Sequence, residues 1–102
     1  MSLVYVTDEA DAMIVTASEW WRTNRLKAPD LFKDELRGAK ERLEQHPKAG
    51  RVVPRRGFPG LRRLILRRTR YHVYYRYFPK HDEVWLVAVW AGMRGRGPRL
   101  KR

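Results

Sequence analysis

The spacing of apolar residues changes once along this chain, and that change constrains the fold more than any other feature of the sequence. Between residues 8 and 46, apolar residues recur every three or four positions, as on one face of a helix. Between residues 61 and 90 they alternate with polar residues or run continuously, as in strands. A segment rich in Pro and Gly, residues 47–60, separates the two patterns. The sequence therefore predicts helices followed by a sheet, the order of an α+β domain.

The first half of the chain predicts one strand and two helices. Residues 3–7 are mostly β-branched or aromatic and predict a short strand, with Thr7 or Asp8 placed to cap the next element. A first helix is expected over residues 8–26, and a second over residues 29–46, where a Pro follows and ends it. The apolar stripes of these helices are Ala10, Met13, Ile14, Ala17 and Trp21, then Phe32, Leu36, Ala39 and Leu43.

The second half predicts a small antiparallel sheet. Three strand-like runs, roughly residues 61–68, 70–78 and 84–90, are joined by connections short enough for hairpins. The last run is apolar on both faces and predicts an interior strand. Residues 47–60 are expected to form a basic loop with little regular structure, and residues 92–102 a basic tail. The whole chain of 102 residues is then one domain, in which an N-terminal strand and a helical hairpin pack on the sheet.

The composition excludes several classes of site. The chain has no cysteine, which excludes disulfides, thiolate metal sites and cysteine nucleophiles. It also shows no phosphate-binding loop, nucleophile elbow, paired carboxylate motif or zinc-ligand spacing, so we expect no metal and no cofactor. No apolar run is long enough to cross a bilayer, and acidic residues replace the cationic start of a signal peptide. We therefore expect a cytoplasmic protein that does not contact membranes.

Positive charge is concentrated in the second half of the chain. The net charge of the chain is +12. Residues 1–50 carry eight Lys or Arg and nine Asp or Glu, which gives this half a net charge of −1. Residues 51–102 carry fifteen Lys or Arg and two Asp or Glu, which gives this half a net charge of +13. A solubilising surface usually mixes both signs. This asymmetry instead favours a polyanionic partner, either nucleic acid or an acidic protein.

The segment Leu61–Arg70 is the densest part of this charge. It contains five arginines, Arg62, Arg63, Arg67, Arg68 and Arg70. Guanidinium groups alternating with aliphatic residues would line one sheet edge, where they can bind phosphates or the carboxylates of a partner. For any single arginine, an edge strand charged against aggregation is an equal alternative. On the first helix, Trp20 and Trp21 cannot both face one core, which leaves Trp20 available for a partner.

One histidine and several tyrosines are further candidates. His72 falls in the middle of a predicted strand near the arginines, where an imidazole can act as general acid or base in phosphodiester cleavage. The alternative is a histidine that is only hydrogen-bonded within the sheet. The basic half contains only two acidic residues, which are too few to supply the ligands of a metal ion. Such cleavage would therefore have to proceed without a metal. The strand tyrosines Tyr71, Tyr74, Tyr75 and Tyr77 are expected to fill the core.

The order of strand, two helices, Pro/Gly loop, three-strand meander and basic tail resembles the RelE/ParE toxin superfamily. Three segments carry the resemblance: PGLRRL at 59–64, RRTRYHVYYR at 67–76 and VAVWAGMR at 87–94. It covers nearly the whole chain. It implies a toxin encoded beside an acidic antitoxin that wraps and neutralises it, with a toxin–antitoxin heterotetramer as one form of the complex.

Two activities occur in this superfamily. RelE-like members cut mRNA in the ribosomal A site without a metal, whereas ParE-like members inhibit DNA gyrase and block replication. When this sequence is compared with the residues that RelE-like members use for cleavage, Arg63 and Arg94 occupy positions where basic residues are expected. The positions that depart from the expected residues are Ile65, His72, Ala91 and Leu100.

The arginine-rich strand segment and the Gly-Arg-Gly-Pro-Arg end look more like ParE-like chains. The resemblance thus favours a growth-arresting toxin that binds gyrase through a basic sheet face and tail and has no catalytic residues. The predicted binding residues are Arg62, Arg63, Arg67, Arg68, Arg70, Arg94, Arg96 and Trp20.

Two alternatives stay open. The first is a ribosome-dependent endoribonuclease in which Arg63 and Arg94 stabilise the phosphorane and His72 transfers a proton. The second is a basic nucleic-acid-binding module, which would need exposed aromatic side chains that stack on bases.

Overall fold

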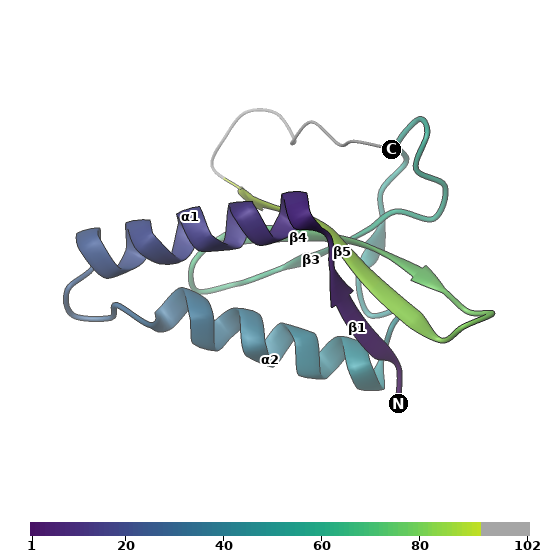
Figure 1. Cartoon of the computed structure of the whole chain (residues 1–102), viewed down its shortest axis with the longest axis horizontal. Coiled ribbons are helices and arrows are strands. Elements are labelled where there is room, and N and C mark those ends of the chain that lie inside the picture. The colour runs from purple at the N-terminus through teal and green to yellow at the C-terminus, as the bar shows by residue number, and fades with distance from the viewer. Residues whose placement is uncertain (93–102) are drawn as a thin grey trace.

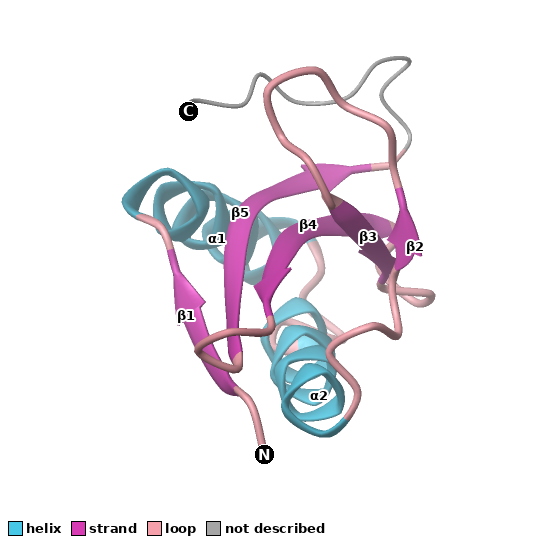
Figure 2. Ribbon diagram, turned by 90° about the vertical axis from the view of Figure 1, so that its right-hand side faces the viewer, coloured by secondary structure: helices cyan, strands magenta, loops and turns pink. Residues whose placement is uncertain are grey.

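The structure is a computed structural model that describes residues 1–92 of the chain. Its elements are β1 (Leu3–Val6), α1 (Asp8–Asn24), α2 (Leu31–Gln45), β2 (Arg51–Val52), β3 (Arg62–Ile65), β4 (Tyr71–Phe78) and β5 (Glu83–Ala91). The two helices lie side by side over one face of a single twisted sheet, as Figures 1 and 2 show. The predicted α+β fold is confirmed.

The sheet has five strands in the order β1-β5-β4-β3-β2 and is mixed. The predicted meander is present, because β3 and β4, and β4 and β5, pair antiparallel. β5 is an interior strand, as its two apolar faces predicted. The expectation of a purely antiparallel sheet was wrong in one respect: β1 belongs to the sheet and runs parallel to β5, with Val4 opposite Val84. A parallel pair needs a long crossover, and the two helices that follow β1 begin one.

Local signals set the helix boundaries. Thr7 is the N-cap of α1, and its hydroxyl accepts a hydrogen bond from the amide of Ala10 at 3.2 Å. Three acidic residues occupy the first turn of α1, where they interact favourably with the helix dipole. α2 ends at Gln45, two residues before Pro47.

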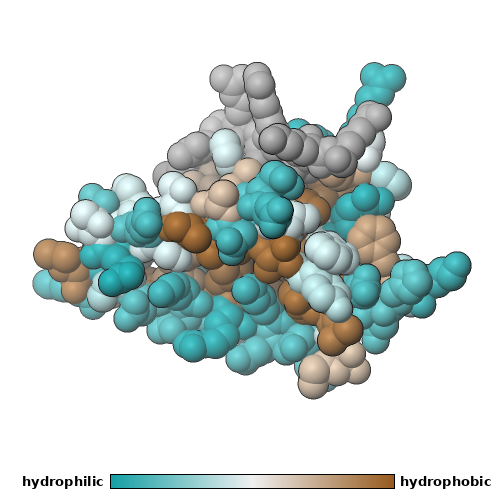
Figure 3. Space-filling model, in the orientation of Figure 1, coloured by the Kyte–Doolittle hydropathy of each residue, from teal (hydrophilic) through white to brown (hydrophobic). Residues whose placement is uncertain are grey.

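The main core lies between the helices and the sheet. Phe32, Leu36 and Leu43 project from α2 and are almost completely buried. They pack in one cluster with β4 and β5 residues such as Val73 and Leu86. On the molecular face seen in Figure 3, hydrophilic side chains cover most of α2, and hydrophobic ones form a broken band between the helices toward β1.

The segment between α2 and β3 is more ordered than the Pro/Gly content predicted. Two of its residues form β2, which pairs with β3. Phe58 turns back onto the face of the sheet opposite the helices and joins a second cluster with Leu61, Tyr74 and Ala88. The expectation of little regular structure was therefore incomplete, because one buried aromatic residue anchors the segment.

None of the helices in the described part of the chain is long and apolar enough to cross a membrane.

Candidate interaction surfaces

The turn between β3 and β4 carries three of the predicted arginines. β3 ends at Ile65, earlier than the expected residue 68, so Arg67, Arg68 and Arg70 lie in a turn and not on a strand edge. We call these three residues the arginine turn. All three are exposed, and no carboxylate of residues 1–92 lies within ion-pair distance of them. Their charges are therefore available to a partner.

Glu35 of α2 holds this turn in place. Its carboxylate accepts hydrogen bonds from the amides of Arg68 and Thr69 at 2.7 and 3.0 Å. The hydroxyl of Thr69 donates a third hydrogen bond to it, at 2.7 Å. Bonds to a charged acceptor are stronger than neutral ones, so this carboxylate fixes the turn backbone while the guanidinium groups point elsewhere.

Arg62 and Arg63 on β3 have different surroundings. The guanidinium of Arg62 donates to the carbonyls of Gly50 and Lys48 at 2.7 and 3.3 Å, so it binds the chain itself. Arg63 is partly buried, and its Nε atom has no hydrogen-bond partner within the described residues. Of this pair, Arg63 retains the greater capacity to bind another molecule.

His72 lies near Arg63 on the sheet face turned away from the helices. It is directly opposite Ile65 of β3, which carries no polar group. Burial lowers the pKa of His72 below its ordinary value of 6.5, and the positive charge of Arg63 lowers it further. A Cβ atom placed on Gly92 would lie 2.5 Å from Nε2 of His72, so the ring packs closely against the end of β5. Burial and the Arg63 charge both disfavour the charged form of this imidazole.

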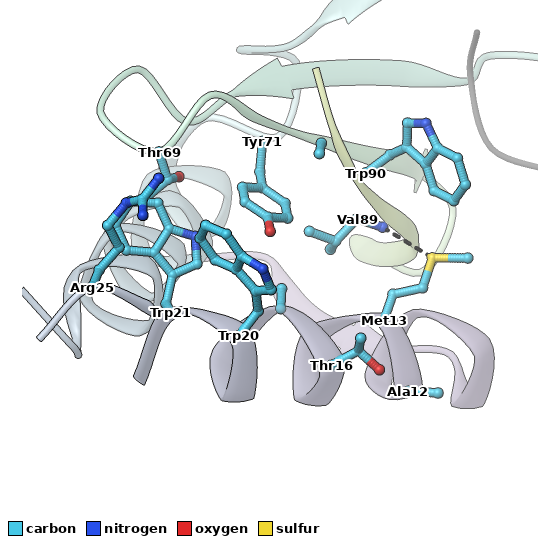
Figure 4. A pocket seen from close by; sticks show the side chains of 12 residues that line it. Ala12, Met13, Thr16, Trp20, Trp21, Arg25, Thr69, Tyr71, Val89 and Trp90 are labelled. Atoms are coloured by element: carbon cyan, nitrogen blue, oxygen red, sulfur yellow. Dashed lines mark hydrogen bonds between the residues drawn. The ribbon is translucent and has the colours of Figure 1, made fainter. Parts of the chain in front are cut away.

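An apolar groove lies between α1 and the adjoining ends of β4 and β5. Its volume is about 570 Å³. The residues that line it are Ala12, Met13, Thr16, Ala17, Trp20, Trp21, Arg25, Thr69, Tyr71, Val89, Trp90 and Ala91. Figure 4 shows the side chains of α1 and those of the two strands converging from opposite walls.

Trp20 forms part of one wall of this groove and is 43% exposed. The prediction that Trp20 faces outward agrees with this position. Trp21 packs against the main core, and the two rings meet edge to face at 5.8 Å between centroids. The guanidinium carbon of Arg25 lies 4.8 Å from the Trp20 ring centroid, which places a positive charge at the mouth of the groove.

The groove and the arginine turn adjoin each other. Thr69 connects them, because it lines the groove and lies between Arg68 and Arg70 in the sequence. Two residues later, Tyr71 lines the groove and packs on Phe32. The apolar groove and the arginine turn therefore form one continuous surface.

Some expectations fall outside the described residues. Arg94, Arg96 and Leu100 lie beyond residue 92, and so does nearly all of the predicted basic tail. Within residues 1–92 no group of His, Asp and Glu side chains could hold a metal ion.

Sequence reasoning missed both the groove and Glu35. The groove joins α1 to residues of β4, β5 and the preceding turn that are distant in the sequence, and no local pattern reveals such a contact. Glu35 lies 34 residues before Thr69 and reads as one more charged residue on a helix surface. The available signal was its position beside the buried stripe residue Leu36.

Comparisons with known proteins agree with this architecture. A family model described as "ParE toxin of type II toxin-antitoxin system, parDE" matches residues 4–95. A search of curated protein sequences finds no match. Among solved structures, the chromosomal ParDE system of P. aeruginosa is similar at 20% identity with a TM-score of 0.66, covering 89% of this chain and 96% of that one.

The isolated E. coli RelE toxin is similar as well, at 16% identity with a TM-score of 0.60, covering 93% of this chain and 88% of the other. The intact E. coli RelBE toxin–antitoxin complex gives the same identity and TM-score. At these identities the structural matches establish the fold, and the family model covers most of the sequence. The chain therefore belongs to the ParE toxin family of type II toxin–antitoxin systems, within the RelE/ParE superfamily.

Proposed function

We propose that this toxin arrests growth by binding DNA gyrase through the arginine turn and does not cleave RNA. The observation that carries the proposal is the turn itself: three exposed arginines that no internal carboxylate neutralises, on a backbone fixed by Glu35. A turn whose backbone is already fixed loses less conformational entropy on binding than a mobile one. Such a turn suits docking onto a large partner. Arg63, Arg94 and Arg96 complete the proposed contact set.

Three features argue against the ribonuclease alternative. Ile65 is apolar, whereas RelE-like nucleases are expected to have a second basic residue at this position. The pKa of His72 is lowered and its ring packs against Gly92, so it cannot supply the fixed positive charge of the arginine it replaces. Ala91 offers no imidazole at the end of β5. Arg63 alone among the described residues retains both the position and the charge that stabilisation of a phosphorane requires.

We further propose that a cognate acidic antitoxin neutralises the toxin by covering the groove and the arginine turn together. Apolar side chains of an antitoxin segment would fill the groove beside Trp20, and carboxylates of the same segment would pair with the arginine turn. The indole N–H of Trp21 is buried without an acceptor within residues 1–92, which such a segment can supply after a small shift. The same surface would then be withheld from the target. The toxin–antitoxin heterotetramer is the assembly we expect for this complex.

Purified full-length toxin tests the proposal in two parallel assays. Supercoiling by gyrase on relaxed plasmid should be inhibited, and mRNA on programmed ribosomes should stay intact. Ribosome-dependent cleavage that His72→Gln abolishes, with gyrase unaffected, would establish the alternative instead.

A further inference from the structure

A second surface, separate from the groove and the arginine turn, lies on the opposite face of the sheet near its β1 edge. Val4 and Val84 point into the main core, so their neighbours Tyr5 and Trp85 project from the outer face. Tyr5 lies opposite Trp85, and Trp85 lies opposite Arg76 on the next strand. These three residues therefore form a row across β1, β5 and β4, which we call the aromatic row.

The rings of the row are ordered and partly exposed. Tyr5 and Trp85 stack with their centroids 4.8 Å apart and their planes inclined by 21°. The indole N–H of Trp85 donates to Glu83 at 3.3 Å, which fixes the orientation of that ring. Tyr5 is 37% exposed, and β1 is the edge strand, so no further strand covers the outer face of its ring.

Arg76 places a positive charge beside the stacked rings. Its guanidinium carbon lies 5.0 Å from the ring centroid of Phe78, and its Nε donates to the carbonyl of Pro59 at 3.3 Å. One of the three guanidinium nitrogens thus anchors the side chain, and the group keeps further N–H donors that can bind a phosphate.

Basic residues lie in the segments next to Arg76, whereas Asp82 lies beside the start of β1, where it accepts a hydrogen bond from Ser2. Pro59 belongs to the loop that also carries Arg55 and Arg56, and Lys80 lies in the β4–β5 turn. On the face itself the acidic side chain is Glu83, which accepts the hydrogen bond from Trp85. The net charge of the chain is +12, so a negatively charged ligand is attracted to the protein as a whole, and Arg76 places a positive charge on this face.

We propose that the aromatic row binds single-stranded nucleic acid. A base stacks on the outer face of Tyr5 and extends the existing Tyr5–Trp85 stack, and Arg76 binds the adjoining phosphate. Every base has a π-face, so this arrangement needs no particular sequence. A duplex keeps its bases stacked on each other and cannot use the row. This function is additional to gyrase binding and uses none of the residues proposed for it.

Fluorescence anisotropy with labelled oligonucleotides of about ten nucleotides tests the proposal on the full-length toxin. Because a chain of this charge attracts any polyanion, binding is compared at roughly 0.3 M salt, where non-specific binding is weak. Oligo-dT and oligo-U distinguish DNA from RNA as the source of the ligand, and a duplex of equal length is the reference. We expect single strands to bind more tightly than the duplex and to quench tryptophan fluorescence.

Substitutions at Tyr5 separate stacking from charge. Tyr5→Leu removes the ring and should weaken single-strand binding by roughly fivefold to a hundredfold, whereas Tyr5→Phe keeps the ring and the affinity. Arg76→Gln should weaken binding and reduce its salt dependence, compared with Arg22→Gln on α1, which removes the same charge elsewhere. Circular dichroism shows whether each variant is folded.

Equal binding by wild type and Tyr5→Leu, or equal binding of duplex and single strand, would overturn the proposal. If Tyr5→Leu instead weakened binding of a protein and left oligonucleotide binding intact, the row would be a protein-docking face and the proposal would be wrong. Neither result affects gyrase inhibition, which depends on the arginine turn.

Discussion

The hydroxyl of Thr69 donates a hydrogen bond of 2.7 Å to the carboxylate of Glu35, which joins the β3–β4 turn to the middle of α2. Two backbone amides of the turn bind the same carboxylate. One acidic residue thus organises a surface whose other charges are positive. The Glu35 carboxylate binds the backbone and Thr69 of the turn, and it does not form ion pairs with the three arginine side chains.

Glu35→Ala should destabilise the protein and weaken the binding of gyrase by the arginine turn. The change leaves two amides and a hydroxyl without their acceptor, at a cost of about 1–3 kcal/mol in the free energy of unfolding. Urea denaturation measures this loss, with Glu41→Ala, an exposed site on the same helix, as the matched control. We also expect weaker gyrase inhibition although every arginine is retained. Unchanged stability and unchanged inhibition would show that the turn does not depend on this carboxylate.

Tyr75→Phe should destabilise the fold by about 1–3 kcal/mol, because a buried N–H would lose its acceptor. The Tyr75 hydroxyl is completely buried with its side chain and accepts a 2.7 Å hydrogen bond from the amide of Gly50. The control is Tyr77→Phe, whose hydroxyl bonds to Asp82 at an exposed site and whose loss should cost roughly 0.5 kcal/mol or less. Equal denaturation midpoints for the two variants would contradict this assignment.

His72 should titrate below pH 6.5 in the folded protein, because burial and Arg63 both disfavour its protonated form. The unfolded chain then binds more protons than the folded one just below pH 6.5, so the free energy of unfolding decreases as the pH falls through that value. Proton NMR of the imidazole measures the pKa directly. Arg63→Gln should raise this pKa by removing the nearby charge. A pKa above 6.5 in the wild type would contradict the prediction.

Trp20→Ala should weaken antitoxin binding without unfolding the toxin. The side chain is 43% exposed and forms a wall of the groove, so its loss removes contact area for the partner more than core packing. For an aromatic residue at the centre of an interface we expect roughly a thirtyfold increase in Kd. Calorimetry with the purified antitoxin measures it, and Leu26→Ala, at an 81% exposed site outside the groove, is the control. Similar affinities for the two variants would place the antitoxin elsewhere.

Features encoded by nearby residues could be predicted from the sequence. The helices follow from the stripes that contain Ala17 and Leu36, and the cap from Thr7, because capping and amphipathicity act within a few residues. The antiparallel meander follows from alternation and short connections. Trp20 was predicted to face outward because its neighbour had to be buried.

Features that depend on distant contacts could not be predicted in this way. The parallel pairing of Val4 with Val84 joins residues at opposite ends of the domain, and neither strand carries a local signal for it. The alternating arginines suggested a strand to residue 68, but the hydrogen bond that the Arg68 amide donates to Glu35 holds Arg68 in a turn. The stack of Tyr5 on Trp85 likewise exists only once those two strands are adjacent.

Binding of gyrase by the arginine turn can be measured in a supercoiling assay with charge-matched variants. One variant replaces Arg67, Arg68 and Arg70 by Gln, and the other replaces Lys27, Lys33 and Lys40 by Gln, so both lose the same net charge. We expect the arginine variant to fail to inhibit supercoiling and the lysine variant to inhibit as the wild type does. Full inhibition by the arginine variant, or equal loss in both, would contradict it.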